Sequence, residues 1–228
     1  MGRPAAERRV DLVQLYREVQ NCRRCPLHAT RTQVVFGSGN ADADLMFVGE
    51  APGFHEDQQG IPFVGAAGKL LDKLLAEIGM QRGDVFIANV LKSRPPGNRD
   101  PQLEEIEACK PYLTRQIELI EPRVICTLGN FSTKLLTRRQ DGITRVHGKA
   151  QDHVIAGLPI RIYPIYHPAA GLRSTAMLET LREDFKRLPA LLEAARPQPE
   201  EEPEPEDDDG AGGGSAQPVA AAQLGLFG

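Results

Sequence analysis

Short apolar runs alternate along this chain with segments whose apolar residues recur at helical spacing. Four apolar runs predict buried strands at 45–49, 85–91, 123–129 and 160–167. Helical periodicity predicts helices at 11–20, 67–79, 101–120, 131–136 and 174–193. Strands that alternate with helices form parallel sheets that are covered on both faces. The pattern therefore predicts an α/β fold, with three α/β/α layers around a mainly parallel four-stranded central sheet.

Polar segments follow three of the predicted strands. They read GEAPG from residue 49, NVLKSR from residue 89 and YHPAAGLR from residue 166. Parallel sheets bind ligands in the crevice outside the carboxyl ends of their strands. We therefore expect these three segments to meet in one site. The stretches 49–65 and 93–101, which are rich in glycine or proline, predict loops.

Composition divides the chain near residue 194. Residues 1–193 hold all the predicted elements, whereas 194–222 are first acidic and then rich in glycine and alanine. A segment with so little to bury predicts a disordered linker. Its residues 200–209 carry eight acidic side chains and no basic one, so the net charge of −4 becomes +4 without them. A mildly basic body with an acidic tail is compatible with DNA binding.

Membrane and secretion signals are missing from the sequence. The chain has no run of about 18 apolar residues, and its charged N-terminus lacks an apolar signal core. We therefore expect a cytoplasmic protein that does not enter membranes. In that compartment its four cysteines, Cys22, Cys25, Cys109 and Cys126, favour metal or cluster binding over disulfides.

The three polar segments together resemble the signature blocks of a known family. Residues 49–71, 89–101 and 166–173 are similar, in the same order, to blocks of the family 4 uracil-DNA glycosylases, iron–sulfur proteins of bacteria and archaea. The resemblance covers about residues 15–188. It implies a DNA-repair enzyme that flips uracil out of DNA and hydrolyses its N-glycosidic bond, leaving an abasic site. We also expect a monomer associated with the nucleoid.

Three residues match the family's base-binding positions. Phe63 matches the phenylalanine on which uracil stacks, and Asn89 matches the amide that pairs with uracil N3–H and O4. His167 matches the histidine that stabilises negative charge on the departing base. The alternatives are a core aromatic, a turn residue at a strand end and a structural histidine.

The GEAPG block supplies a further catalytic candidate and two substrate-binding candidates. Glu50 matches the family's acidic residue, which positions water or stabilises the cationic sugar. Ala51 and Gly53 are expected to bind the substrate, the glycine through its backbone amide. Glu56 and Asp57 lie nearby, and a solvated loop carboxylate is an equally good interpretation of each.

DNA contacts are expected beside the second and third blocks. Lys92, Arg94 and Arg173 are candidates for phosphate contacts, as is Arg99. Leu172 is the candidate wedge that fills the space left by the flipped nucleotide.

The cysteines match a cluster site with one departure. Cys22, Cys25 and Cys109 match three of the four ligands of the family's [4Fe–4S] cluster, but Ser93 stands where the fourth cysteine is expected. Ser93 ligates through oxygen, or the cluster has three protein ligands or is lost, or the serine is an engineered replacement; a zinc site or bare thiols are the remaining alternatives.

The last residues of the chain predict a binding partner. Residues 223–227 (QLGLF, within the predicted peptide 223–228) resemble the short peptide by which bacterial repair proteins bind the sliding clamp.

One alternative function is a non-catalytic DNA-binding or polymerase-associated module on the same fold. Another is a glycosylase for a different deaminated base such as hypoxanthine. The presence of Phe63, Asn89 and His167 favours uracil excision.

Overall fold

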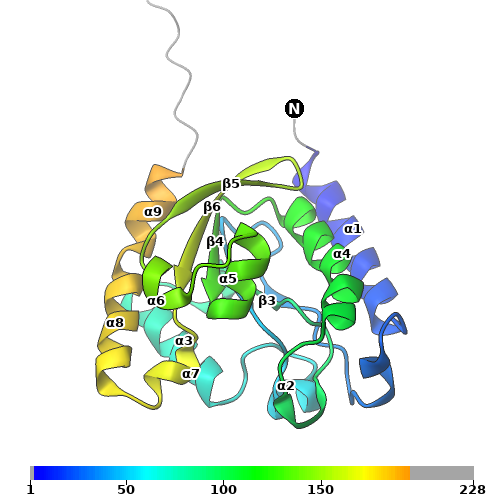
Figure 1. Cartoon of the computed structure of the whole chain (residues 1–228). Coiled ribbons are helices and arrows are strands. Elements are labelled where there is room, and N and C mark those ends of the chain that lie inside the picture. The colour runs from blue at the N-terminus through cyan, green and yellow to red at the C-terminus, as the bar shows by residue number, and fades with distance from the viewer. Residues whose placement is uncertain (1–2, 196–228) are drawn as a thin grey trace, which may run out of the picture. The chain divides into compact units, whose positions relative to one another are not determined.

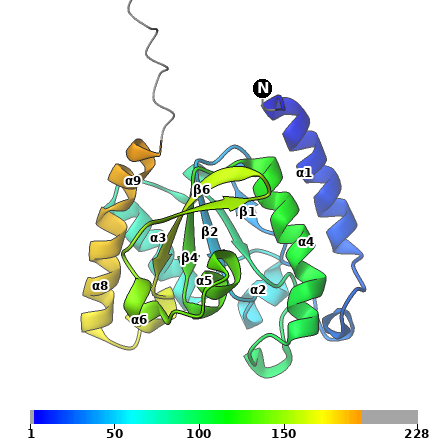
Figure 2. The same cartoon turned by 45° about the horizontal axis from the view of Figure 1, so that its top comes forward.

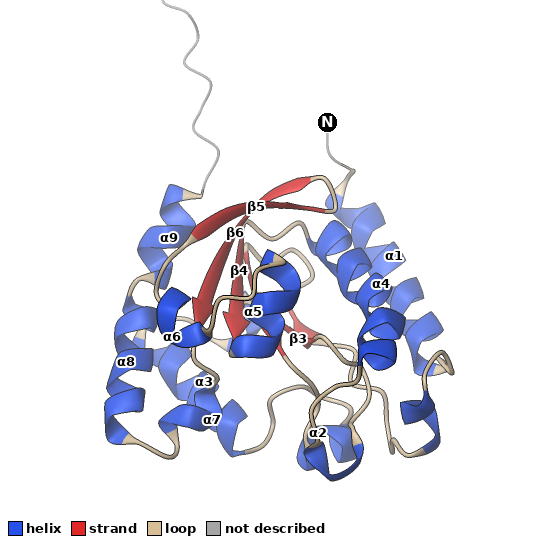
Figure 3. Cartoon of the chain, in the orientation of Figure 1, coloured by secondary structure: helices blue, strands red, loops and turns tan. Residues whose placement is uncertain are grey.

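A twisted six-stranded sheet forms the middle layer of the computed structural model, which describes residues 3–195 (Figures 1 and 3). The strand order is β1-β3-β2-β4-β6-β5. The four inner strands are parallel, and the two edge strands are antiparallel to their neighbours. The strands are β1 Ser38–Gly39, β2 Leu45–Gly49, β3 Phe86–Asn89, β4 Val124–Leu128, β5 Gln151–Ile155 and β6 Leu158–Ile165.

The predicted fold class is confirmed, and the predicted strand count was two too low. The four predicted strands are the four parallel ones. The missed β1 has only two residues, and β5 alternates half-buried with exposed positions because it lies at the sheet edge. Neither has an apolar run, so hydrophobicity alone did not reveal them.

Helices cover both faces of the sheet. The α-helices are α1 Ala5–Gln20, α2 Phe54–Gln59, α3 Ala66–Glu77, α4 Leu103–Ile120, α5 Asn130–Thr137, α6 Ile143–Val146, α7 Pro168–Gly171, α8 Thr175–Lys186 and α9 Leu188–Ala194. Short 3-10 turns lie at η1 Pro26–Ala29, η2 Arg82–Asp84 and η3 Pro96–Asn98. Figures 1 and 2 show α1 and α4 on one side of the sheet and α3, α8 and α9 on the other.

Alternating side chains of the inner strands build two separate cores. Met46 and Val48 of β2 pack with α1 and α4, whereas Leu45 and Phe47 of the same strand pack with α3 and α8. Successive residues of a strand point to opposite faces, so a continuous apolar run fills both cores. This explains why the parallel strands read as unbroken apolar runs in the sequence.

Several predicted boundaries shift in the structure, and in two places the elements themselves differ. Residues 54–59 form α2 inside a stretch predicted to be a loop, and 174–193 form two helices that meet at Arg187. Pro189, at the start of α9, lacks the N–H that a continuous helix needs. The last helix ends at Ala194, one residue beyond the predicted domain boundary. Of the predicted linker 194–222 only the first two residues are described, and the predicted peptide 223–228 lies outside the described residues.

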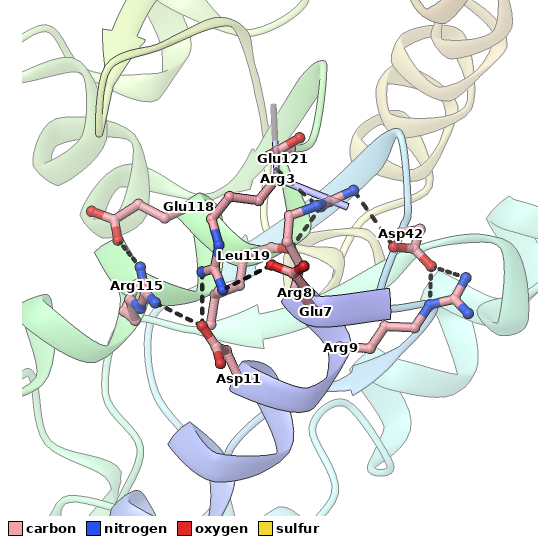
Figure 4. Close-up of polar contacts among 10 residues, drawn as sticks. All are labelled: Arg3, Glu7, Arg8, Arg9, Asp11, Asp42, Arg115, Glu118, Leu119 and Glu121. Carbon is pink, nitrogen blue, oxygen red and sulfur yellow. Dashed lines mark hydrogen bonds and ion pairs between the residues drawn. The ribbon is translucent and has the colours of Figure 1, made fainter. Parts of the chain in front are cut away.

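Helix α1 is fixed to the rest of the domain by ion pairs as well as by apolar contacts (Figure 4). Arg8 donates to the Leu119 carbonyl at 2.7 Å and lies 3.7 Å from Asp42. Arg115 of α4 reaches Asp11 of α1 at 3.3 Å. In the part of the chain that the structure describes, no helix is both long and apolar enough to cross a membrane.

Candidate active site

A cavity of about 670 Å³ opens at the carboxyl ends of β2, β3 and β6. Gly49 ends β2, Asn89 ends β3, and His167 follows β6 by two residues. Because these strands are parallel, their carboxyl ends lie at one edge of the sheet. Candidates from all three polar segments line the cavity: Glu50, Ala51, Gly53, Phe63, Asn89, His167 and Arg173.

Gly49 allows the ring and the amide to approach each other. A Cβ built on Gly49 would lie 2.8 Å from Cζ of Phe63 and would also collide with Oδ1 of Asn89. The Phe63 ring in turn lies beside the imidazole of His167, with ring centroids 5.5 Å apart and planes inclined by 30°. The phenyl ring, the carboxamide and the imidazole therefore converge in one place.

The side chain of Asn89 has an unusual environment for a polar group. It is only 2% exposed, and its Oδ1 accepts no hydrogen bond from any of the described residues. An unpaired buried acceptor costs about 1–3 kcal/mol. Asn89 lines the cavity, and its carboxamide oxygen is left without a hydrogen-bond partner among residues 3–195.

His167 is held as a neutral donor. The backbone N–H of Ala169 donates to Nδ1 of His167 at 3.1 Å, so the proton of the neutral ring is on Nε2. Burial lowers the pKa of His167 to about 4, and the negative charge of Glu56 only partly offsets this effect. At neutral pH the imidazole is therefore uncharged and presents an Nε2–H.

Two carboxyl groups line the cavity, those of Glu50 and Glu56, and their surroundings differ. Burial, aided by the negative charge of Asp100, raises the pKa of Glu50. Glu56 instead accepts hydrogen bonds from the backbone N–H groups of Val64 and Gly65, both at 2.9 Å, and lines the cavity. The interpretation of Glu56 as a solvated loop carboxylate was wrong, because helix α2, which carries it, was missed.

Asp57 is also not a solvated carboxylate. It is 3% exposed, and its two carboxylate oxygens accept from the backbone N–H of Thr32 at 3.0 and 3.1 Å. It lies outside the group of residues that line the cavity. Its role is therefore to fasten α2 to the segment that follows η1.

Comparisons with known proteins identify the family. The family model described as the uracil DNA glycosylase superfamily matches residues 36–191. The chain belongs to this superfamily. It is 47% identical over 190 residues to a type-4 uracil-DNA glycosylase of Archaeoglobus fulgidus, covering 82% of this chain and 96% of the relative. It is 48% identical over 182 residues to the type-4 enzyme of Saccharolobus solfataricus, covering 78% and 84%. A DNA polymerase of Bacillus phage SP01 is 34% identical over 163 residues, which are 71% of this chain but 17% of the polymerase.

Lys92 was predicted to contact DNA phosphates in this superfamily member, and the structure contradicts that. Its side chain is 2% exposed, and Nζ donates to the carbonyl oxygen of Asn89 at 2.8 Å and to Oε1 of Gln116 at 2.6 Å. Burial lowers its pKa to about 7. The Lys92 side chain thus hydrogen-bonds to the last residue of β3 from within the core, where a DNA phosphate cannot reach it.

The other DNA-contact candidates of the glycosylase fold lie at the surface. Leu172 is 52% exposed and Arg173 is exposed at the cavity rim, both just after α7. Arg94 is half-buried, and its guanidinium lies 5.3 Å from the ring centroid of Phe54. Gly171 faces inward, because a Cβ there would lie 2.8 Å from Leu181. Leu172 is therefore an exposed apolar side chain of this turn, whereas Gly171 has no room for a side chain.

The cysteines matched to the family's cluster ligands lie within electrostatic range of one another. Burial raises the pKa of the Cys109 thiol, and the negative charges of Cys25 and Cys22 raise it further. The Oγ of Ser93 accepts a hydrogen bond from the Arg31 guanidinium at 3.3 Å. No group of three His, Cys, Asp or Glu side chains in residues 3–195 converges tightly enough to hold a single metal ion.

Proposed function

We propose that this chain is a uracil-DNA glycosylase, which hydrolyses the N-glycosidic bond of uracil in DNA and leaves an abasic site. The observation that carries the proposal is the convergence of Phe63, Asn89 and His167 in one cavity, with Oδ1 of Asn89 unpartnered among the described residues. Uracil has an N3–H donor that satisfies this oxygen, whereas N3 of cytosine is an acceptor. Asn89 thus matches the polar edge of uracil, and Phe63 matches its aromatic face.

The reaction begins with flipping of the nucleotide, because the glycosidic bond is inaccessible in the stacked duplex. The extruded base stacks on Phe63 and pairs with Asn89. As the bond breaks, negative charge develops on the base, and the Nε2–H of His167 is directed at its O2. One such donor in a desolvated site lowers the barrier by about 3–4 kcal/mol.

Glu50 serves the sugar side of the bond. Its raised pKa makes it a better proton acceptor than an exposed glutamate, which suits a group that positions water for attack on the sugar carbon. Its carboxylate also stabilises positive charge on the sugar as the base leaves. Ala51 and Gly53 line the same cavity and bring their backbone close to the substrate.

DNA binding is proposed to use the surface around the cavity. Arg94 and Arg173 contact phosphates, and Leu172 enters the stack where the nucleotide has left. We further propose that the enzyme acts as a monomer beside the nucleoid. Residues 223–227 are proposed to bind the sliding clamp, on the strength of their sequence alone.

We also propose an iron–sulfur cluster held by Cys22, Cys25 and Cys109. The electrostatic coupling of the three thiols supports this set, and a cluster needs wider spacing than a single ion because each thiolate binds a different iron. When bound, the cluster supplies structural iron–thiolate links. Ser93, which is engaged by Arg31, is a poor fourth ligand, because oxygen suits iron–sulfur sites less than sulfur does.

Uracil release from a labelled oligonucleotide tests the function. The wild type is expected to release uracil, and Asn89→Ala is expected to be at least about 100-fold slower, with Asn21→Ala, an exposed amide outside the cavity, as the matched control. Release of hypoxanthine but not uracil would support the other deaminated base. No release of any base by the wild type would overturn the proposal in favour of a non-catalytic DNA-binding or polymerase-associated module on the same fold.

The cluster is tested by its iron and sulfide content and by the visible spectrum of anaerobically purified protein. Ser93→Cys is expected to raise the iron content and to slow loss of the chromophore in air. Cys126→Ser, in the buried strand β4, is expected to change neither. Absence of iron and sulfide from both the wild type and Ser93→Cys would contradict the cluster.

A further inference from the structure

Phe63 has a backbone conformation that an aromatic residue rarely adopts. Its φ is +54°, in the left-handed region that favours glycine. A non-glycine residue there is strained and persists only when its surroundings enforce the conformation. The peptide groups around Phe63 show what enforces it.

Arg82 binds this peptide from one side. Its Nη1 donates to the carbonyl oxygen of Phe63 at 2.7 Å, and its Nη2 donates to that of Pro62 at 2.6 Å. Nη1 also lies 3.0 Å from Oδ1 of Asp72, which orients the guanidinium. A planar fork can bind two successive carbonyl groups at once, whereas the single ammonium of lysine has no such geometry.

Glu56 and Gly68 complete the restraint. Oε1 of Glu56 accepts from the N–H groups of Val64 and Gly65, which directly follow Phe63. A Cβ built on Gly68 would collide with the carbonyl group of Phe63, so helix α3 packs against the same peptide. Hydrogen bonds therefore fix the carbonyl groups of Pro62 and Phe63 and the N–H groups of Val64 and Gly65.

The restraint fixes the position of the ring in the cavity. The Phe63 ring packs against Gly49 and lies beside His167. The side chain of Arg82 itself is 29% exposed and is not among the residues that line the cavity. Its influence on the site therefore passes through the Phe63 peptide.

We propose that Arg82 is a positioning residue that holds Phe63 in its left-handed conformation and thereby sets the face on which the base stacks. The inference rests on the proposed uracil excision. The ion pair of Arg82 with Asp72 is half-exposed, and such pairs contribute little to stability. Loss of Arg82 should therefore act through the two carbonyl hydrogen bonds that position Phe63 rather than through the ion pair.

A double-mutant cycle between Arg82 and Phe63 is the first test. Arg82→Ala is expected to lower single-turnover kcat/KM by about 10- to 100-fold, because a displacement of about 1 Å in a catalytic site costs up to 100-fold. Arg82→Lys is expected to rescue little. In the Phe63→Ala background, Arg82→Ala should add less than about twofold, because the ring that it positions is gone. Arg182→Ala, which removes a half-buried arginine that is paired with Glu77 and lies outside the cavity, is the matched control.

An equal effect of Arg82→Ala with and without Phe63 would overturn the inference, and so would unchanged activity of Arg82→Ala. A readout independent of catalysis separates these outcomes from failure of the proposed function. The protein has eight phenylalanines, so 4-fluorophenylalanine labelling gives eight ¹⁹F signals, and Phe63→Leu assigns one of them. Arg82→Ala is expected to shift or broaden that signal more than the other seven. An unmoved signal would overturn the inference even if the wild type released no uracil.

Discussion

Removing the imidazole of His167 tests the electrostatics of the site most directly. The pKa of His167 is about 4, so at pH 5.5 neutral rings outnumber charged ones by about 30 to 1. If the neutral Nε2–H is the working group, titration of His167 should leave no inflection in wild-type kcat/KM between about pH 5.5 and pH 8. Loss of this donor in His167→Ala should slow uracil release by about 100- to 1,000-fold.

The assay is single-turnover uracil release measured across this pH range, with His153→Ala as the matched control. His153 also has a lowered pKa, mainly through burial, but lies in strand β5 away from the cavity. An inflection near pH 6.5 that disappears in His167→Ala would refute the reasoning, because it would make the charged ring the working form. A rate that falls as pH rises from 4 would refute it as well.

The same pKa predicts how stability depends on pH. Between about pH 4 and pH 6.5 an unfolded histidine binds a proton that folded His167 does not, so the unfolding free energy rises with pH across this window. The slope should decrease in His167→Ala. Urea unfolding at a series of pH values measures it, and an unchanged slope would contradict the buried neutral state.

Three further predictions concern neighbouring positions. Gly49→Ala should reduce uracil release at least about 100-fold, because the new methyl group occupies space used by the ring and the amide; near wild-type release would contradict the packing. Lys92→Met should destabilise the protein by about 1–3 kcal/mol for each carbonyl oxygen left unpaired, measured by urea unfolding against the exposed control Lys186→Met. Leu172→Ala should slow excision from duplex DNA more than from single strands, and equal slowing on both would exclude a wedge.

The sequence predicted the parts of the fold that depend on apolar runs. All four inner strands follow from such runs, and their shared direction follows from the helices between them. Strand β5 was missed because its residues alternate between half-buried and exposed positions. Helix α2 was missed because six polar and aromatic residues between two glycines carry no helical period.

The candidate site was predictable where the topology decides it. Asn89 and His167 lie where parallel strands end, and parallel strands end at one edge. Lys92 was misassigned because lysine is exposed by default, and only tertiary packing against Gln116 buries it. Arg82 escaped notice because it acts on the backbone of residues some 20 positions earlier, and no residue pattern marks such a contact.

Two energetically unfavourable features of this fold belong to residues that line the same cavity. One is the left-handed backbone of Phe63, and the other is the unpaired oxygen of Asn89. Elsewhere in residues 3–195, the buried unpaired atoms are those of Arg8 and Asp42, whose side chains face each other as an ion pair, and Oε1 of Gln151 in the edge strand β5. The oxygen of Asn89 has no such ion-pair partner among these residues. A fold that maintains both unfavourable features at one place is preorganised for a ligand with a flat ring and a hydrogen-bond donor. A flipped uracil has both.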